Sequence, residues 1–485
     1  MLIRQSKNSF IRIYDGGQLG YITNQLTRHD RSYNESGADF LAQITRDPKS
    51  IDDIVFDLKK IYDVDEDTIR DDFMEFALDL ADHKFVVIGD SVADLRIKDI
   101  DFSYSLENPK TLADDFTQQT KEHPNITSEQ FLLQHDRESP RLAALQFELT
   151  SRCNERCIHC YIPNGKKNKG FDLTFDKFKY ILDQFSDMGG IHVTLSGGEA
   201  LMNKEIVEML QYSREKDMQI SLLTNLIALT DEQIQIIKDT NVSVVQVSLY
   251  SMDASVHDTI TTVKGSWLRT KDSIEKLHAA DVPVQISCPV MKANKDGYDK
   301  VMQYAQSLKM KSNTDFIMMA QADLDTSNLA NRLSIDETEK VIRDIMNFDR
   351  DYKEQTLELE PVSSIPLEEF SKMPLCGAGI NDLCITVNGD VYPCAGWQSF
   401  VVGNVFKQPL KDIWNNSPKL AEIRNVSHKD FPKCLTCEAI DYCSMCLVRN
   451  YNESGGDMLK ANPHFCDVAF LTKRIVEEYK EKGHI

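Results

Sequence analysis

The chain has 485 residues, enough for two to four domains, and its 41% hydrophobic and 27% charged residues are typical of a globular protein. Its 76 acidic against 55 basic side chains give a net charge of −21, which argues against nucleic acid as a main partner. No run approaches the roughly 18 apolar residues of a membrane span, and the start lacks the apolar core of a signal peptide. We therefore expect a cytoplasmic protein that does not contact membranes.

The first 90 residues have the pattern of a small winged-helix-like domain. Two β-type segments flank Asp15-Gly16-Gly17 and predict a hairpin. Helical patterns follow at 36–46, 50–62 and 66–82, and a short apolar strand is expected at 85–88. Ser50 followed by Asp53 predicts a helix start. Residues 91–140 are polar and weakly patterned, so we expect a linker there; residues 1–140 carry 16 basic and 28 acidic side chains.

Residues 141–330 alternate between apolar runs and amphipathic segments. The runs are 145–149, 192–195, 219–223, 244–249, 284–290 and 316–319, and the amphipathic segments include 175–185, 206–215, 231–237 and 267–279. Six such repeats predict an α/β fold with a parallel sheet, either doubly wound or a partial (β/α)6 TIM-like barrel. In both folds the chemistry lies at the carboxyl ends of the strands. A connecting segment at 331–370 precedes a cysteine-rich C-terminal region, 371–485, with a hairpin and a final helix at 467–482.

Cysteine is the most informative residue type in this chain. There are twelve, and in a reducing compartment such clustered thiols are more often metal or cluster ligands than disulfides. Cys153, Cys157 and Cys160 follow the first strand directly. Three thiolates can hold three irons of a four-iron cluster and leave the fourth iron open, whereas zinc requires a fourth protein ligand. His159 lies between two of the cysteines, a poor position for that fourth ligand.

This C-x3-C-x2-C loop at the end of a first strand resembles the radical S-adenosylmethionine (SAM) superfamily. Gly197-Gly198-Glu199 after the second strand resemble the family's GGE motif, and Thr224-Asn225 after the third resemble its TN. Ser248 occupies a position whose hydroxyl contacts ribose in the family. Thr224, Asn225 and Ser248 are equally compatible with simple strand-end caps. The resemblance implies that SAM contacts Gly197, Gly198, Glu199, Asn225, Ser248 and His159.

The same resemblance implies the chemistry. The open iron would bind the amino and carboxylate groups of SAM and deliver an electron to its sulfonium. The resulting 5′-deoxyadenosyl radical would abstract hydrogen from a substrate. The sequence does not identify a catalytic acid or base.

The C-terminal cysteines resemble the SPASM domain, which binds two auxiliary four-iron clusters. One cluster would take Cys376, Cys394 and Cys446, and the other would take Cys434, Cys437, Cys443 and Cys466. Two residues separate the last two cysteines of the central run, Cys443 and Cys446, where the family usually has three. A zinc ribbon is the alternative for 434–446, but its central gap is short for that pattern. The total would be three [4Fe-4S] clusters.

Two cysteines fall outside this assignment. The number of C-terminal cysteines favours Cys384 as the fourth ligand of the first auxiliary cluster, because two sets of four would then use all eight. A two-residue Asn388-Gly389 turn, however, would pair Val387 with Asp390 and point Cys384 away from Cys394, unless strand irregularity rotates it. Its role stays open at this point. Cys288, alone in an apolar strand, is expected to be a small core residue.

The N-terminal domain resembles the PqqD-like element of peptide maturases, which captures a precursor's leader as an added strand. The three resemblances together imply a radical SAM maturase of a ribosomal precursor peptide, with a flavodoxin or ferredoxin as reductant. A cysteine thioether is the favoured product. Carbon–carbon cross-linking, formylglycine-type maturation and a non-catalytic iron–sulfur electron carrier are the alternatives. A DNA-binding winged helix is a competing interpretation of residues 1–90, which the acidic balance of residues 1–140 disfavours.

Overall fold

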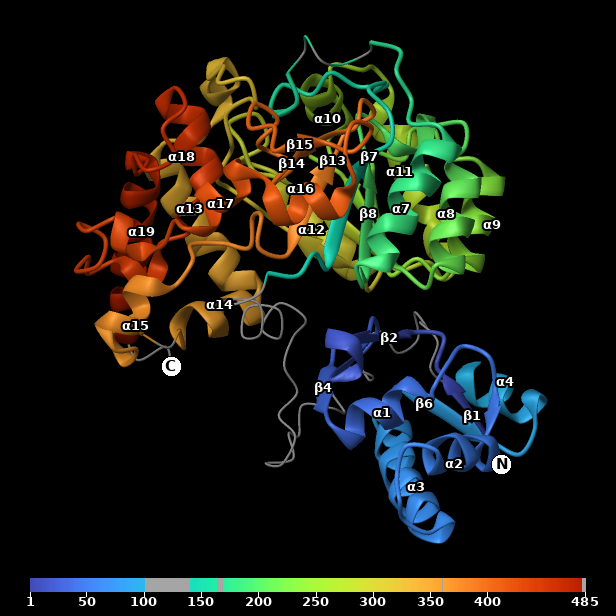
Figure 1. Cartoon of the computed structure of the whole chain (residues 1–485). Helices are drawn as coiled ribbons and strands as arrows, with labels where there is room; N and C mark the ends of the chain where they lie inside the picture. Colours follow the sequence, from blue (N-terminus) through green and yellow to red (C-terminus); the bar gives the residue numbers. More distant parts are fainter. Residues whose placement is uncertain (101–139, 164, 166, 168, 360, 482–485) are drawn as a thin grey trace.

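The computed structural model describes residues 1–100, 140–163, 165, 167, 169–359 and 361–481. It shows an α/β protein in which an N-terminal unit lies below a barrel and a C-terminal region covers one side of that barrel (Figure 1). No helix in the described ranges has the length and apolar character needed to cross a bilayer.

The N-terminal unit contains two small sheets and four helices. One sheet is an antiparallel meander of β2 (Ser9–Tyr14), β3 (Leu19–Asn24) and β4 (Asp30–Asn34), which confirms the predicted hairpin. The other has the order β5 (Lys49–Ser50), β1 (Leu2–Gln5), β6 (Val86–Gly89). The helices are α1 (Ser36–Ala42), α2 (Ile51–Lys59), α3 (Glu66–Asp82) and α4 (Val92–Ile100). Ser50 caps α2 as predicted, because its hydroxyl accepts the Asp53 backbone N–H at 3.0 Å.

Helix α4 corrects the predicted extent of the linker. Sequence analysis assigned residues from 91 onward to a linker, but 92–100 are helical and pack on β1 and β6. Leu95 is fully buried, and Asp99 forms an ion pair with Arg4 at 2.6 Å. These contacts with residues distant in the sequence hold α4 in position, although its own amphipathic pattern is weak. The rest of the predicted linker, 101–139, lies outside the described residues.

The barrel has six parallel strands and confirms the predicted partial (β/α)6 architecture. They are β7 (Ala144–Glu148), β8 (His192–Ser196), β9 (Gln219–Thr224), β10 (Val244–Ser248), β11 (Val284–Ser287) and β12 (Lys311–Asn313). The helices are α7 (Phe175–Asp187), α8 (Ile206–Glu215), α9 (Asp231–Asp239), α10 (Ala254–Thr261), α11 (Ser266–Ala279) and α12 (Tyr298–Ser307). The sixth strand was predicted at 316–319, which is wrong: β12 lies earlier, and 316–319 is irregular.

The barrel core lies between the sheet and its helices. Alternate residues such as Leu145 and Phe147 on β7 are buried, and the Phe147 ring packs on Phe178 of α7 at 4.7 Å between centroids. Gln146 and Glu148, which alternate with them along the strand, are partly exposed. This period of two is expected for strands covered by helices on one face.

The C-terminal hairpin extends the barrel sheet. Strand β13 (Asp382–Ile385) pairs in parallel with β7, and β14 (Asp390–Tyr392) and β15 (Gly403–Asn404) continue antiparallel. The remaining helices are α13 (Ile335–Phe348), α14 (Arg350–Leu357), α15 (Leu367–Lys372), α16 (Leu410–Asn416), α17 (Pro418–Arg424), α18 (Leu447–Ser454) and α19 (Pro463–Glu481). The cysteine-rich region is therefore built onto the first barrel strand, beside the predicted cluster loop.

Candidate active site

The loop with Cys153, Cys157 and Cys160 begins where β7 ends, and all three thiols are partly exposed. Backbone bonds hold it: the N–H groups of Arg156 and Ile158 donate to carbonyls at the end of α10, both at 3.0 Å. Burial raises the pKa of Cys153 to about 12, so without a bound cation its thiol is neutral near pH 7. The donor set, three sulfurs on one short loop, fits a cluster with an open iron.

The two glycines of the GGE segment let β8 contact this loop closely. The N–H groups of Gly198 and Glu199 donate to the Thr150 and Arg152 carbonyls, each at 2.8 Å. A Cβ on Gly198 would lie 2.3 Å from the Arg152 carbonyl oxygen and 3.1 Å from Cys153 Cβ. Glycine is required here because backbone packs on backbone. The predicted GGE motif therefore fixes the position of the cysteine loop.

Glu199 connects the ends of β8 and β9. Its side chain is 2% exposed and accepts hydrogen bonds from Thr224 Oγ1 (2.5 Å), the Asn225 N–H (2.7 Å) and the Leu201 N–H (3.1 Å). Burial raises the pKa of Glu199, and these hydrogen bonds offset part of that rise. Asn225 Nδ2 donates in turn to Asn154 Oδ1 in the cysteine loop at 2.7 Å. The structure thus brings the GGE, TN and cysteine motifs together.

Sequence analysis missed two residues beside the loop, Glu155 and Tyr250. Glu155 is 3% exposed, and its Oε2 accepts from Cys157 Sγ at 3.2 Å; burial raises its pKa to about 7. Tyr250 Oη lies 3.9 Å from Cys157 Sγ, and the side chain hydrogen-bonds Ser248. A glutamate inside the loop and a tyrosine after a strand carry no distinctive spacing, so no sequence signal marked them.

His159, predicted to contact SAM, packs edge-on against Tyr250 with 4.8 Å between ring centroids. Burial, reinforced by the charge of Lys167, lowers the pKa of His159 to about 4. The imidazole is therefore neutral near pH 7.

Two cavities lie beside the cysteine loop. One, of about 230 Å³, is formed by the ends of β7 and β8 and the hairpin β13–β14; Glu148, Lys167, Gly198, Tyr392 and Gln398 line it. Gln398 Nε2 donates to Glu148 Oε1 at 2.5 Å. The other, of about 160 Å³, is bordered by His159, Tyr161 and the segments after β11 and β12, with three methionines in its wall. Both open on the carboxyl ends of the strands, where an α/β enzyme binds its ligands.

The C-terminal cysteines gather in two groups. Burial raises the pKa of the Cys394 thiol to about 12, and the neighbouring Asp382, Cys446 and Cys376 raise it further. The thiols of Cys434, Cys437 and Cys466 act in the same way on Cys443. These are the two sets implied by the SPASM resemblance. Within the described residues, no three His, Cys, Asp or Glu side chains, the cysteines of these two sets included, are arranged closely enough to hold a single metal ion.

The hairpin register differs from the prediction and changes the position of Cys384. The connection has three residues, Val387 to Gly389, with Gly389 at φ 80°, and Cys384 pairs with Tyr392. The predicted two-residue turn is wrong by one residue. Gly389 is required because a Cβ there would lie 2.4 Å from the Phe406 ring.

In the observed register Cys384 pairs with Tyr392, and Cys394 lies two residues beyond the end of β14. Burial raises the pKa of the Cys384 thiol well above its usual range, and the neighbouring Glu148 and Cys394 raise it further. The geometric argument against Cys384 therefore fails. Cys288 is fully buried, as predicted.

Three family models match the chain. The radical SAM superfamily model matches residues 147–305. The chain contains a radical SAM domain. The iron-sulfur cluster-binding domain model, SPASM, matches residues 376–438, and the coenzyme PQQ synthesis protein D (PqqD) model matches 29–86. Radical SAM and SPASM domains imply four-iron clusters and SAM binding.

Curated relatives are similar along the barrel and beyond. An AdoMet-dependent heme synthase of Methanosarcina barkeri is 27% identical over 343 residues, 67% of this chain and 96% of the relative. The antilisterial bacteriocin subtilosin biosynthesis protein AlbA of Bacillus subtilis is 26% identical over 313 residues, 64% of this chain and 68% of AlbA.

Solved structures share the fold. Streptococcus suis SuiB bound to its precursor peptide SuiA superposes with a TM-score of 0.62 at 18% identity, covering 92% of this chain and 96% of SuiB. The enzyme anSMEcpe with bound AdoMet and a peptide has a TM-score of 0.53 at 16% identity, covering 70% of this chain and 99% of that one.

Proposed function

We propose that this protein is a radical SAM maturase that forms a cross-link in a ribosomally synthesised precursor peptide. The observation that carries the proposal is the presence, on one chain, of a PqqD domain, a radical SAM barrel and two groups of C-terminal cysteines. The names of AlbA, of the precursor-bound SuiB and of a PqqA peptide cyclase from Streptomyces rochei, 25% identical over 301 residues, support a peptide substrate.

Three four-iron clusters are part of this proposal. Cys153, Cys157 and Cys160 hold the first. Cys434, Cys437, Cys443 and Cys466 hold one auxiliary cluster. The other takes Cys376, Cys394 and Cys446, with Cys384 as a fourth ligand, which the observed register supports. When bound, the first cluster and SAM supply a 5′-deoxyadenosyl radical that removes a hydrogen atom from the substrate.

The chain itself positions the reactants. The Gly197-Gly198-Glu199 segment fixes the cysteine loop, and Asn225 and Ser248 at the ends of β9 and β10 face the same edge. The 160 Å³ cavity, with neutral His159 and its methionine wall, suits the adenosyl group of SAM. The 230 Å³ cavity between β7 and the hairpin then receives the peptide side chain, where Gln398 orients the Glu148 carboxylate.

Anaerobic reconstitution tests the cofactor assignment. We expect about twelve irons per chain, and about eight would reject one auxiliary cluster. Changing the three loop cysteines to Ala should abolish 5′-deoxyadenosine formation and leave the auxiliary-cluster absorption and electron paramagnetic resonance signals. Continued cleavage of SAM by this triple variant would contradict the open-iron site.

The peptide encoded by the small reading frame beside the gene tests the substrate. A thioether product is two hydrogens lighter than the precursor, and its cysteine resists alkylation. The same mass loss with full alkylation means a carbon–carbon link. We expect thioether formation to require Cys394. In anisotropy titrations the full precursor should bind at least tenfold more tightly than the leaderless form. Equal affinities would remove the leader-binding role.

The heme synthase relatives suggest a different substrate class, a porphyrin. Their similarity covers 67% of this chain, and a porphyrin substrate gives no role to the PqqD domain. Conversion of a porphyrin but not of the precursor would replace the peptide proposal.

A further inference from the structure

The N-terminal unit is attached to the barrel at the end opposite the cysteine loop. Its contacts are with the connections that precede β8, β9 and β10, which contain Gly189-Gly190, Asp217 and Asn241. Strands β7 to β10 are parallel, and the cysteine, GGE and TN motifs follow their carboxyl ends. The attachment and the candidate active site are therefore separated by the full length of the strands (Figure 1).

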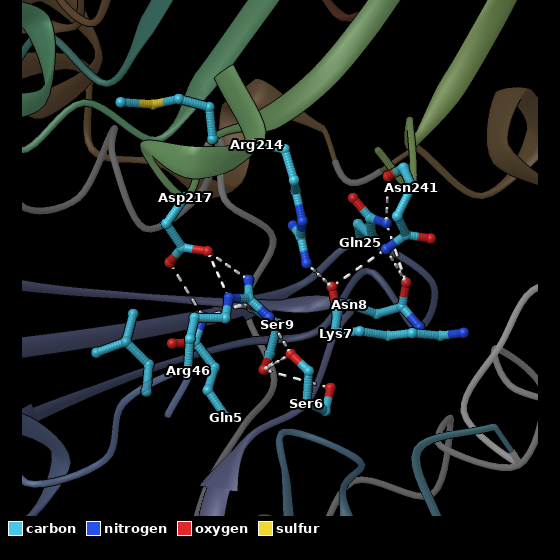
Figure 2. Close-up of polar contacts among 12 residues, drawn as sticks. Gln5, Ser6, Lys7, Asn8, Ser9, Gln25, Arg46, Arg214, Asp217 and Asn241 are labelled. Atoms are coloured by element: carbon cyan, nitrogen blue, oxygen red, sulfur yellow. Dashed lines mark hydrogen bonds and ion pairs between the residues drawn. The ribbon is translucent and has the colours of Figure 1, made fainter. Parts of the chain in front are cut away.

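Asp217 is the centre of this attachment (Figure 2). Its carboxylate accepts from Arg46 Nε at 2.6 Å, from Gln5 Nε2 at 3.3 Å and from Arg12 Nη1 at 3.4 Å. Arg12 also donates to the Asp217 carbonyl at 2.7 Å and to the Gly190 carbonyl at 2.8 Å. The Arg12 side chain is only 12% exposed. Because two of these acceptors are backbone carbonyls of the barrel, the bonds fix the orientation of the N-terminal unit on the barrel as well as its distance from it.

A second group of contacts lies beside the first (Figure 2). Arg214 Nη2 donates to the Lys7 carbonyl at 2.7 Å, and Asn241 Nδ2 donates to the same carbonyl at 3.1 Å and to Asn8 Oδ1 at 2.8 Å. Gln25 Nε2 donates to the Asn241 carbonyl at 3.2 Å. The Arg46 and Arg214 guanidinium groups both pack over the ring of a buried phenylalanine, Phe10.

An apolar cluster completes the attachment. Tyr14 and Phe10 of β2 are buried with Ala143 and Ile191, which precede β7 and β8. Tyr14 Oη donates to the Gly189 carbonyl at 3.1 Å, and a Cβ on Gly189 would lie 2.7 Å from the Tyr14 ring. Packing this close, combined with directional hydrogen bonds, leaves the unit no freedom to rotate without breaking several contacts together.

The outer edge of the meander, on β4, lies on the side of that sheet opposite β2. The meander has the order β2-β3-β4, with β2 against the barrel, and among the described residues no strand pairs with the outer edge of β4. A leader added as a strand would pair there.

We propose that this fixed attachment makes the enzyme select precursors by the number of residues between the leader segment and the modified residue. The inference rests on the proposed function. The barrel strands β8, β9 and β10 have five or six residues, so the sheet is about 17–20 Å long. An extended peptide spans at most about 3.6 Å per residue, so at least about six residues are needed to reach from one end of the sheet to the other. A shorter spacer leaves the modified residue outside the active site.

The test is a series of precursors whose spacers are shortened from twelve residues to about three, with leader and modified residue unchanged. With the wild-type enzyme, modification should fall at least tenfold below a threshold of about six residues or more, whereas the anisotropy affinity stays constant. Equal modification rates at three and twelve residues would overturn the inference. If no precursor of the series binds or reacts, the proposed function fails instead.

A matched pair of variants tests the role of the attachment. Asp217→Asn weakens the centre of the attachment. Asp183→Asn removes a carboxylate of α7 whose ion pairs, with Lys179 and Lys216, are both within the barrel. In Asp217→Asn, backbone amides of Ser9–Tyr14 should exchange hydrogen at least tenfold faster, and the shortest precursors should regain modification to within about threefold of the long ones.

Asp183→Asn should leave both the exchange and the threshold unchanged. Faster exchange in Asp217→Asn with an unchanged threshold would refute the link between fixed attachment and spacer length. Arg12→Gln, which removes the Arg12 bonds to Asp217 and to the Gly190 carbonyl, repeats the measurement if Asp217→Asn does not fold.

Discussion

Gly198→Ala tests how the GGE segment holds the cysteine loop. The new Cβ would lie 2.3 Å from the Arg152 carbonyl oxygen and 2.7 Å from its carbon. Both are backbone atoms, so no side-chain rotation relieves the clash, and a shift of about 1 Å is needed to reach normal contact. Such overpacking costs about 1–3 kcal/mol, and the two 2.8 Å hydrogen bonds that it weakens contribute about 0.5–1.5 kcal/mol each. We expect a loss of about 2–6 kcal/mol in the free energy of unfolding.

The same shift moves Cys153, whose Cβ would lie 3.1 Å from the new methyl group. Because a misplacement of about 1 Å in an active site can reduce a rate about a hundredfold, 5′-deoxyadenosine formation should fall by that order. Denaturant unfolding of the cluster-free protein and a reductive-cleavage assay measure the two effects. Gly297→Ala is the control, since nothing lies within 4 Å of a Cβ at that position. Wild-type stability and cleavage in Gly198→Ala would refute the argument.

Three further predictions concern other parts of the molecule. Burial lowers the pKa of His192 from 6.5 to about 4, so the neutral ring contributes stability above pH 6.5 that is lost as the pH falls to about 4. Denaturant unfolding across this pH range should show a loss of about 3 kcal/mol in the free energy of unfolding, and His192→Gln should not show it. Arg332→Ala should destabilise the fold by about 3–5 kcal/mol in thermal or denaturant unfolding, because it leaves the Glu453 carboxylate, 10% exposed, without its cation; a loss below 1 kcal/mol would contradict this. Cys384→Ala should alter the electron paramagnetic resonance spectrum of one auxiliary cluster only, and an unchanged spectrum would make Cys384 a bystander.

The active-site motifs were predictable because they are local. Cys153, Cys157 and Cys160 lie within eight residues, so their proximity requires no long-range packing. Parallel strands with their carboxyl ends at one edge then bring Gly198 and Asn225 to the same place, which the six apolar runs already indicated. Glu155 and Tyr250 were missed because burial against the loop, rather than any spacing, makes them part of the site.

The auxiliary cysteine groups show the limit of local reasoning. Cys376, Cys394 and Cys446 span seventy residues, and only a family resemblance proposed their grouping. Their proximity depends on β13 joining β7 and on α18 packing beside the hairpin. The face of Cys384 depended on one residue in the turn, since Val387 joins the loop and Gly389 takes φ 80° against the Phe406 ring. A two-residue and a three-residue turn fit the same letters, and the packing of the strands decides between them.

The sequence by itself determined what repeats locally along the chain: the period of the helices and strands, the Ser50 cap and the cysteine loop. Hydrogen bonds and apolar faces within a few residues suffice for these. Only the tertiary structure decided that α4 belongs to the N-terminal unit, that the sixth strand is β12, and that the unit attaches through Asp217 at the end of the barrel away from the cysteines. These outcomes depend on contacts between residues up to about two hundred positions apart. A local sequence pattern does not show such contacts.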